Sequence, residues 1–286
     1  MRVGRIPYIN CYPVYGAIDR GIVPMTAELV DGVPTALNRE MAAGTLDVSV
    51  ISAVEYARDA TKYLLLPDLS ICSDGPVRSV VLFSKRPASE LQGRRVLVSR
   101  SSMTSVALLE LLFENVWDAK PAFIPSNAEL SDVARFGAED HDARLVIGDA
   151  ALHLWSRLRS PDLYPKDDGV TDYRYAYDLG GEWKRWTGLP FVFAVWVSQR
   201  TTPVAGSLGV HAGLIASRDW GLKHLDTLAA QAALATGVHK GVCLEYLSGL
   251  DYGLSYQHLA GLTEFFRRLV AAGKVPNGSL AFLPAA

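Results

Sequence analysis

The sequence predicts an α/β protein of two lobes, each a mostly parallel β-sheet flanked by helices, with a ligand cleft between the lobes. Short β-rich runs alternate with helical patterns along the first half of the chain, which is the order of a parallel sheet covered on both faces. Two long apolar runs, Val77–Ser84 and Phe191–Ser198, bracket a middle block that has strands and helices of its own. About half of the 286 residues are hydrophobic, which is sufficient for a packed core.

Three strand–helix units are expected at the N-terminus. The β-rich runs predict strands at Arg2–Ile6, Thr26–Val30 and Val48–Ile51. The intervening patterns predict helices at Tyr12–Arg20, Val33–Ala43 and Ser52–Arg58. The first two of these helices have a proline in the first turn and a glycine just past the end, a typical pair of helix boundaries.

The middle block is expected to form the second lobe. Its clearest elements are a strand at Arg94–Val98 that leads into a helix, and a strand at Ala143–Ile147 followed by a turn into another helix. After residue 205 the pattern becomes helical, at Leu222–Thr236, Val238–Leu247 and Tyr256–Ala272. We therefore predict that lobe one comprises residues 1–84 and 196–286, and that lobe two comprises residues 85–195.

Composition excludes several classes of protein. The 28 Lys and Arg are dispersed and balanced by 30 Asp and Glu, so no nucleic-acid-binding surface is expected. No apolar run is long enough to span a bilayer, and the N-terminal residues lack a signal-peptide pattern. The widely spaced Cys11, Cys72 and Cys243 suggest no disulfide framework. We expect a cytoplasmic protein that acts on a small molecule.

Known catalytic motifs are absent from the sequence. The six histidines show no metal-ligand spacing, and no C-x-x-C pair occurs, so no metal site is expected. The chain has no G-x-S-x-G elbow, no Walker loop and no G-x-G-x-x-G fingerprint. These absences weaken hydrolase, NTPase and dinucleotide-binding interpretations.

A hydroxyl-rich turn between the strand at Arg94–Val98 and the next helix is the strongest candidate site. Five hydroxyls lie within seven residues, namely Ser99, Ser101, Ser102, Thr104 and Ser105. One hydroxyl is enough to cap a helix, whereas several hydroxyls at the positive end of a helix can also hold an anion. We predict a carboxylate or phosphate site that includes Ser101, Ser102, Thr104 and Ser105.

Polar residues also follow other strands at the predicted cleft. Asn10 follows the first strand, Ser52 ends the third, and Asp149 follows the strand at Ala143–Ile147. Asn10 can bind a ligand hydroxyl, and Asp149 can act as a general base or hydroxyl ligand. Each of the three could instead be an ordinary helix cap.

Further candidates lie in the two long apolar runs. Arg78 and Ser79 lie at the start of the first run, Val77–Ser84, where Arg78 could clamp a carboxylate or form a surface ion pair with Asp74 or another acid. Phe191 or Phe193, after the Gly-Leu-Pro turn, could form the wall of a site for a ring-shaped ligand, or pack structurally.

Ordered motifs over residues 1 to about 270 resemble one known family. They are Gly4-x-Ile6-x-Tyr8-Ile9-Asn10-Cys11-x-Pro13, Gly32-Val33-Pro34-x-x-Leu37-Asn38, Gly44-x-Leu46-Asp47-x-Ser49-x-Ile51-Ser52-x-x-Glu55-Tyr56, Ser79-Val80-x-Leu82-Phe83-Ser84, Ser102-x-Thr104-Ser105, Ile147-Gly148-Asp149-x-Ala151-Leu152, Tyr177-Asp178-Leu179-Gly180-x-x-Trp183 and Thr187-Gly188-Leu189-Pro190-Phe191-Val192-Phe193-Ala194-x-Trp196. Their order resembles the chorismate dehydratases of the futalosine route to menaquinone.

The resemblance implies a type II periplasmic-binding-protein-like fold and a lyase without metal or organic cofactor. The implied reaction converts chorismate to 3-[(1-carboxyvinyl)oxy]benzoate and water. It would use Asn10 at the ring hydroxyl and Ser52, Ser79, Thr104 and Ser105 at the carboxylates, with Asp149, Glu55 or a substrate carboxylate as base. The alternatives are the sister 1,4-dihydroxy-6-naphthoate synthase and a non-catalytic carboxylate-binding protein.

Overall fold

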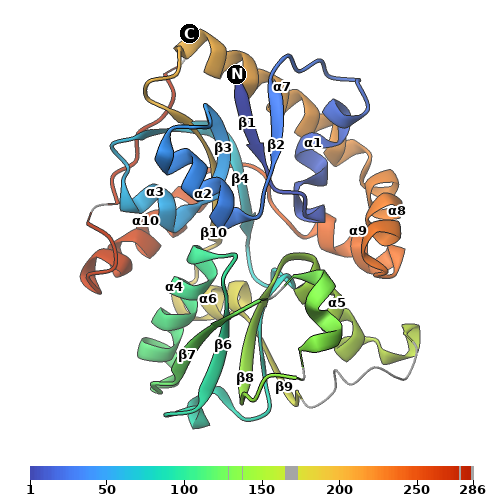
Figure 1. The fold of residues 1–286 in the computed structure, drawn as a ribbon, viewed down its shortest axis with the longest axis vertical. Coiled ribbons are helices and arrows are strands. Elements are labelled where there is room, and N and C mark those ends of the chain that lie inside the picture. The colour runs from blue at the N-terminus through green and yellow to red at the C-terminus, as the bar shows by residue number, and fades with distance from the viewer. Residues whose placement is uncertain (128, 137, 165–172, 277, 285–286) are drawn as a thin grey trace.

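The computed structural model has the two-lobed α/β architecture expected from the sequence, with one five-stranded sheet in each lobe (Figure 1). It describes residues 1–127, 129–136, 138–164, 173–276 and 278–284. Within these ranges, no helix combines the length and apolar character needed to cross a membrane.

The sheet of the first lobe has the strand order β2-β1-β3-β10-β4. The strands are β1 Arg2–Arg5, β2 Glu28–Asp31, β3 Val48–Ser52, β4 Tyr63–Ser73 and β10 Phe191–Gln199. The first three run parallel, whereas β10 is antiparallel to both β3 and β4. Parallel strands β1 and β3 therefore end at the same edge of the sheet.

The sheet of the second lobe repeats this plan with the order β7-β6-β8-β5-β9. The strands are β5 Val80–Ser84, β6 Arg95–Ser99, β7 Ala122–Ser126, β8 Ala143–Ile147 and β9 Tyr175–Asp178. Strands β7, β6 and β8 are parallel, and β5 lies antiparallel between β8 and β9. In both sheets the fourth strand in spatial order is the antiparallel one.

Helices cover both sheets (Figure 1). The α-helices are α1 Tyr12–Asp19, α2 Pro34–Ala43, α3 Ala53–Arg58, α4 Met103–Leu112, α5 Gly148–Arg159, α6 Leu179–Thr187, α7 Val204–Lys223, α8 Leu225–Thr236, α9 Lys240–Ser248 and α10 Tyr256–Ala271. Shorter helical turns are η1 Ile9–Cys11, η2 Ala88–Glu90, η3 Phe113–Trp117, η4 Leu130–Arg135 and η5 Pro161–Leu163.

The strand pairing corrects the predicted lobe boundaries at two places. The run Val77–Ser84 was expected in lobe one, but β5 pairs with β8 and β9 in the second sheet. Conversely, β10 already belongs to the first sheet at Phe191. Every residue of β5, and all but Ala194 of β10, is buried, so an apolar pattern cannot reveal which sheet each strand joins. With these two strands exchanged, the discontinuous division of the chain remains our proposal.

One buried apolar cluster includes side chains from both lobes. At its centre, the ring of Trp183 packs against Phe191 and Phe265, with ring centroids 5.2 and 5.9 Å apart. Trp183 lies on α6, Phe191 begins β10 and Phe265 lies on α10. The aromatic core thus fixes the segment where the chain returns from the second lobe to the first.

Candidate active site

A cavity of about 60 Å³, here called the inner cavity, lies between the two lobes. Its polar lining comes from residues at or just after strand ends, namely Tyr8 and Asn10 after β1, Ser52 of β3, Ser102 and Ser105 after β6, and Gly148 after β8. Ser79, just before β5, and Phe193 and Ala194 of β10 complete one side. Ligands of open parallel sheets bind at such carboxyl ends of strands.

The hydroxyls of the predicted cluster make different contacts at the start of α4. Ser102 is the N-cap residue, and its Oγ accepts a hydrogen bond from the Ser105 backbone N at 3.2 Å and donates one to the Ser105 Oγ at 2.8 Å. Both serines line the inner cavity. This helix start therefore has its cap and still directs two hydroxyls toward the space between the lobes.

The other two predicted hydroxyls lie elsewhere. Thr104 is buried, and its Oγ1 accepts a hydrogen bond from the Val54 backbone N at 3.1 Å, which joins α4 of one lobe to α3 of the other. Ser101 donates to Glu129 Oε1 at 2.5 Å, and the other oxygen of Glu129 accepts from the Tyr8 hydroxyl at 2.8 Å. Glu129 was not predicted, because nothing in its local sequence marks it as a partner of Tyr8.

Asn10 lies on η1 and lines the inner cavity. Its Oδ1 is buried and has no hydrogen-bond partner among the described residues. A buried acceptor without a partner is costly in a folded protein. Asn10 therefore brings an amide whose oxygen has no partner to the wall of the inner cavity.

Asp149 lies beside Asn10, in the first turn of α5, but does not line the inner cavity. Its Oδ1 accepts a hydrogen bond from the Ile9 backbone N at 3.1 Å, which links lobe two to the turn that carries Asn10. Burial raises the pKa of Asp149 to about 7; the hydrogen bond from Ile9 opposes this rise and the charge of Glu129 adds to it. Gly148 has φ 61°, and a Cβ there would lie 2.9 Å from the Tyr8 ring.

Ser52 and Ser79 both line the inner cavity, and each has a buried partner that was not predicted. Ser52 caps α3 by accepting from the Glu55 backbone N at 3.4 Å, and it also accepts from Asn38 Nδ2 at 2.8 Å. The Ser79 Oγ accepts from the Tyr246 hydroxyl at 2.8 Å. Asn38 is buried on α2, and this burial of a polar side chain, which the sequence does not show, marks it as a functional or structural partner.

Two more of the predicted residues, Arg78 and Phe191, also lie away from the inner cavity. Arg78 forms an ion pair with Glu245 at 2.6 Å and lines a separate pocket, so the surface-pair alternative describes its contacts. Phe191 is fully buried in the aromatic core, whereas Phe193 lines the cavity. Ala194 pairs with Ser52, which lines the cavity, so β10 reaches the cavity near Phe193. Phe191 lies two residues earlier along the strand, in the core.

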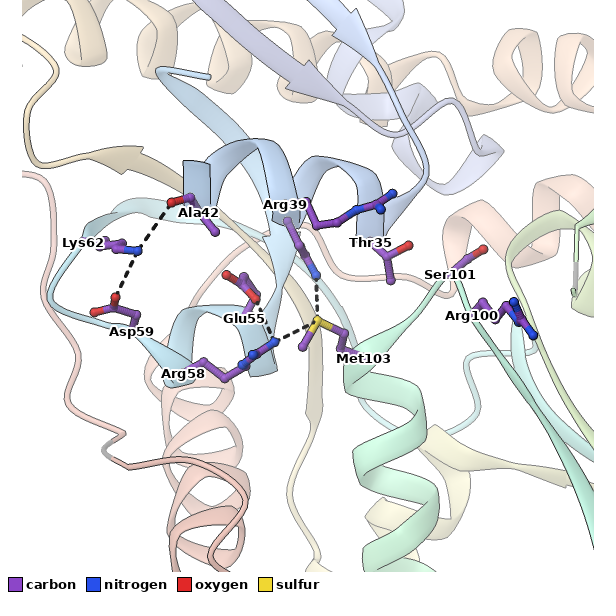
Figure 2. A pocket seen from close by; sticks show the side chains of 11 residues that line it. Thr35, Arg39, Ala42, Glu55, Arg58, Asp59, Lys62, Arg100, Ser101 and Met103 are labelled. Carbon is purple, nitrogen blue, oxygen red and sulfur yellow. Dashed lines mark hydrogen bonds and ion pairs between the residues drawn. The ribbon is translucent and has the colours of Figure 1, made fainter. Parts of the chain in front are cut away.

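A second and larger pocket of about 780 Å³, here called the outer groove, lies beside the inner cavity (Figure 2). Its ionisable lining residues are Arg39, Glu55, Arg58, Asp59, Lys62 and Arg100. Burial raises the pKa of Glu55, with Arg58 and the Tyr63 hydroxyl opposing the rise. As for metals, the described part of the chain holds no group of three or more His, Cys, Asp or Glu arranged to bind an ion.

Comparisons with solved structures agree with the fold. A protein of Archaeoglobus fulgidus superposes with a TM-score of 0.74 at 20% identity, covering 96% of this chain and 98% of that one. The alkanesulfonate-binding protein of Xanthomonas axonopodis pv. citri superposes with a TM-score of 0.67 at 14% identity, covering 98% and 96%. At these identities the likeness establishes a periplasmic-binding-protein-like fold and nothing about the ligand.

Comparisons of sequence establish the family. A family model described as menaquinone biosynthesis matches residues 1–271. A chorismate dehydratase of Thermus thermophilus is 33% identical over 246 residues, which are 84% of this chain and 86% of that protein. A chorismate dehydratase of Campylobacter jejuni is 29% identical over 198 residues, or 68% of this chain and 66% of that protein. The chain therefore belongs to the menaquinone biosynthesis family that includes these chorismate dehydratases.

Proposed function

We propose that this protein is a chorismate dehydratase, a carbon–oxygen lyase that converts chorismate to 3-[(1-carboxyvinyl)oxy]benzoate and water. Family membership supports the substrate, and the inner cavity supports the chemistry. The observation that carries the proposal is the buried, unpartnered Oδ1 of Asn10, a residue that lines a cavity otherwise lined by hydroxyls and apolar groups. Such a site offers hydrogen bonds to a hydroxylated ring with carboxylates.

The two carboxylates of chorismate need two sets of donors. The start of α4, with the hydroxyls of Ser102 and Ser105, offers one set beside the positive end of the helix. Ser52 and Ser79, with the start of α5 nearby in the lining, offer the other; the Gly148 backbone N already donates to the Ser79 carbonyl oxygen at 2.7 Å. Neutral donors at helix starts bind anions without a buried cation.

Asn10 is proposed to bind the ring hydroxyl that leaves. Its Oδ1 accepts the hydroxyl hydrogen and so orients the group, and its Nδ2 can donate to the oxygen as the C–O bond breaks. The ring C–H electron pair becomes part of the aromatic ring, and the hydroxyl departs. The proton taken from the ring ends on that hydroxyl, which leaves as water.

The proton-accepting base is one of two groups. Among the residues that the structure describes, the lining of the inner cavity includes no carboxylate and no imidazole, and Glu55 opens onto the outer groove. This leaves Asp149, which contacts the turn carrying Asn10, and a carboxylate of the substrate itself. Replacing Asp149 with Asn separates the two: a loss of turnover beyond about 10³-fold would identify Asp149 as the base, whereas a loss below about tenfold would favour the substrate carboxylate and leave Asp149 as a positioning residue.

Lobe opening is part of the proposal. About 60 Å³ is the volume of two water molecules, whereas ligand pockets typically measure about 300–1,000 Å³. Chorismate therefore enters an open form, and closure excludes water before the proton is removed. We also propose a cytoplasmic location, in keeping with the free and buried Cys11, Cys72 and Cys243.

Incubation of purified protein with chorismate tests the proposal, with the product followed by chromatography and mass. We expect the benzoate product and loss of one water. Binding without turnover would instead favour the binding-protein alternative. Absence of both binding and turnover would contradict the proposal and direct the assay to the substrate of the sister naphthoate synthase.

A further inference from the structure

The outer groove has a local excess of positive charge in a chain that is nearly neutral. The whole sequence has 28 Lys and Arg against 30 Asp and Glu, whereas the groove has four cations against two carboxylates. Both carboxylates are already paired, Glu55 with Arg58 at 3.6 Å and Asp59 with Lys62 at 3.3 Å. Two positive charges are therefore left without a carboxylate in the groove.

These two charges belong to Arg39 and Arg100. Among the described residues, the Arg39 guanidinium has no hydrogen bond or ion pair, and the Arg100 guanidinium donates only to the Pro125 carbonyl oxygen at 3.2 Å. Arg39 extends from α2 of the first lobe, and Arg100 lies just before α4 of the second (Figure 2). Each lobe thus brings to the groove one guanidinium without a carboxylate partner, a group that can bind a carboxylate through two parallel hydrogen bonds.

A single layer of residues separates the outer groove from the inner cavity. Ser101 and Met103 line the groove, while Ser102 between them lines the cavity. On the other lobe, Asn38 lines the groove and donates to Ser52, which lines the cavity. The groove therefore adjoins the cavity and is separated from it only by this layer of residues.

Met103 is at the centre of this layer. Its Sδ accepts from Asn38 Nδ2 at 3.3 Å and lies 3.9 Å from Arg58 Nη1 (Figure 2). Both contacts, like the Val54–Thr104 hydrogen bond, run from the first lobe to the second. Lobe opening at this seam breaks all three contacts and joins the groove to the cavity.

We infer that the outer groove is an entry site that captures small dianionic carboxylates through Arg39 and Arg100 and passes them to the inner cavity when the lobes open at Met103. The inference rests on the proposed function for the identity of the dianion. A cleft with unpaired cations raises the local concentration of an oppositely charged ligand and its association rate, an effect that salt screens.

A double variant with neutral side chains, Arg39→Gln with Arg100→Gln, tests the entry site. The matched control is Lys120→Gln with Lys223→Gln. Lys120 lies beside Gly93 at the far end of β6 from Arg100, and Lys223 ends α7. Each double variant removes two positive charges, so only their position differs.

The readout is kcat and kcat/KM for chorismate at an ionic strength of about 0.02 M and of about 0.5 M. At low salt we expect the Arg39/Arg100 variant to lose about tenfold in kcat/KM with kcat within twofold, and the difference to shrink at high salt. The Lys120/Lys223 control variant should give the wild-type kcat/KM at both ionic strengths. A kcat/KM equal to that of the control, or a loss that salt does not reduce, would overturn the inference.

Binding of benzene-1,3-dicarboxylate, an unreactive dianion, separates this inference from the proposed function. Calorimetry should show affinity about tenfold weaker in the Arg39/Arg100 variant than in wild type at low salt, with the gap closing at high salt. This result would support the entry site even in a protein that leaves chorismate unchanged. Equal affinity in both proteins, or no binding to wild type, would overturn the entry site while leaving the turnover assay to decide the function.

Discussion

The inner cavity and the outer groove lie on two sides of one seam and have opposite linings. In the described part of the chain, no residue that lines the inner cavity carries a formal charge, whereas four cations and two carboxylates line the outer groove. The inner cavity is also much smaller, about 60 against 780 Å³. The two pockets are therefore suited to different steps. The charged side chains lie in the outer groove, where water remains.

This difference explains how the lobes can close. A cation in the inner cavity would lose its hydration on closure, and an unpaired buried charge costs several kcal/mol. Hydroxyls and helix starts can bind a carboxylate in the closed form and pair with one another in its absence, as Ser102 and Ser105 do. Attraction over distance is then left to the exposed arginines of the groove.

We expect the largest effect on turnover from Asn10→Ala, because this change removes the inner-cavity amide that we assign to the reaction. We expect kcat to fall by about 10²–10⁴-fold with the fold intact, since a positioned group that assists proton transfer contributes on this scale. Asn115→Ala is the control, because Asn115 donates to the Leu111 carbonyl on the far side of α4. Turnover of the Asn10 variant near wild type would remove Asn10 from the mechanism.

Ser105→Ala and Ser101→Ala should distinguish the roles of the two pockets, although both serines belong to the same turn of the chain. Ser105 faces the inner cavity, so losing its hydroxyl should raise KM about tenfold, the effect of one hydrogen bond to a charged group. Ser101 instead contacts Glu129 and lines the groove, so its variant should change KM less than threefold. Equal effects in steady-state kinetics would show that the hydroxyl cluster acts as one site.

The same turn shows how far sequence reasoning reaches into the site. Composition marks the turn as hydroxyl-rich, but residues along a helix point about 100° apart, so only members three or four apart share a face. Ser102 and Ser105 are such a pair, and Thr104 points to α3 instead. Residues at strand ends, such as Asn10 and Ser52, were predictable because parallel strands bring their carboxyl ends to one edge.

The fold was predictable where patterns are regular and not where special residues interrupt them. The expected strand Ala143–Ile147 is confirmed as β8. By contrast, β4 was not predicted, since Pro67 and Asp68, the latter with φ 52°, break its pattern. The long helix α7 was also missed because its glycines weaken helix propensity. Gly221 is needed there, because a Cβ would lie 2.2 Å from the Pro13 carbonyl oxygen.

Phe193→Leu and Phe191→Leu should sharpen the boundary of the inner cavity. Phe193 lines it, so its variant should raise KM several-fold, the effect of about 1 kcal/mol of lost ring contact. Phe191 packs against Trp183 and Phe265 in the core, so its variant should lose about 1–2 kcal/mol in free energy of unfolding with KM near wild type. Chemical denaturation and kinetics on both proteins check this. A KM effect confined to Phe191 would move the cavity boundary.

Asp149→Asn should change the stability of the protein in a way that depends on pH. Burial raises the pKa of Asp149 to about 7 in the folded protein, above the ordinary value near 4 that it has when unfolded. Between those values the unfolded chain releases the proton and the folded protein keeps it, so this carboxyl lowers wild-type stability as pH rises. Asn keeps an acceptor for the Ile9 backbone N and cannot ionise.

The melting temperature of the Asp149→Asn variant should therefore match wild type near pH 4 and exceed it by at least about 2 °C above pH 7. The control is Asp140→Asn, at an exposed carboxylate 3.6 Å from Arg95, and its difference from wild type should not grow over this range. A difference for Asp149→Asn that is constant from pH 4 to 8 would mean that this carboxyl ionises normally. Asp149 would then be an ionised carboxylate at the edge of the inner cavity, and the uncharged region between the lobes would be limited to the cavity lining.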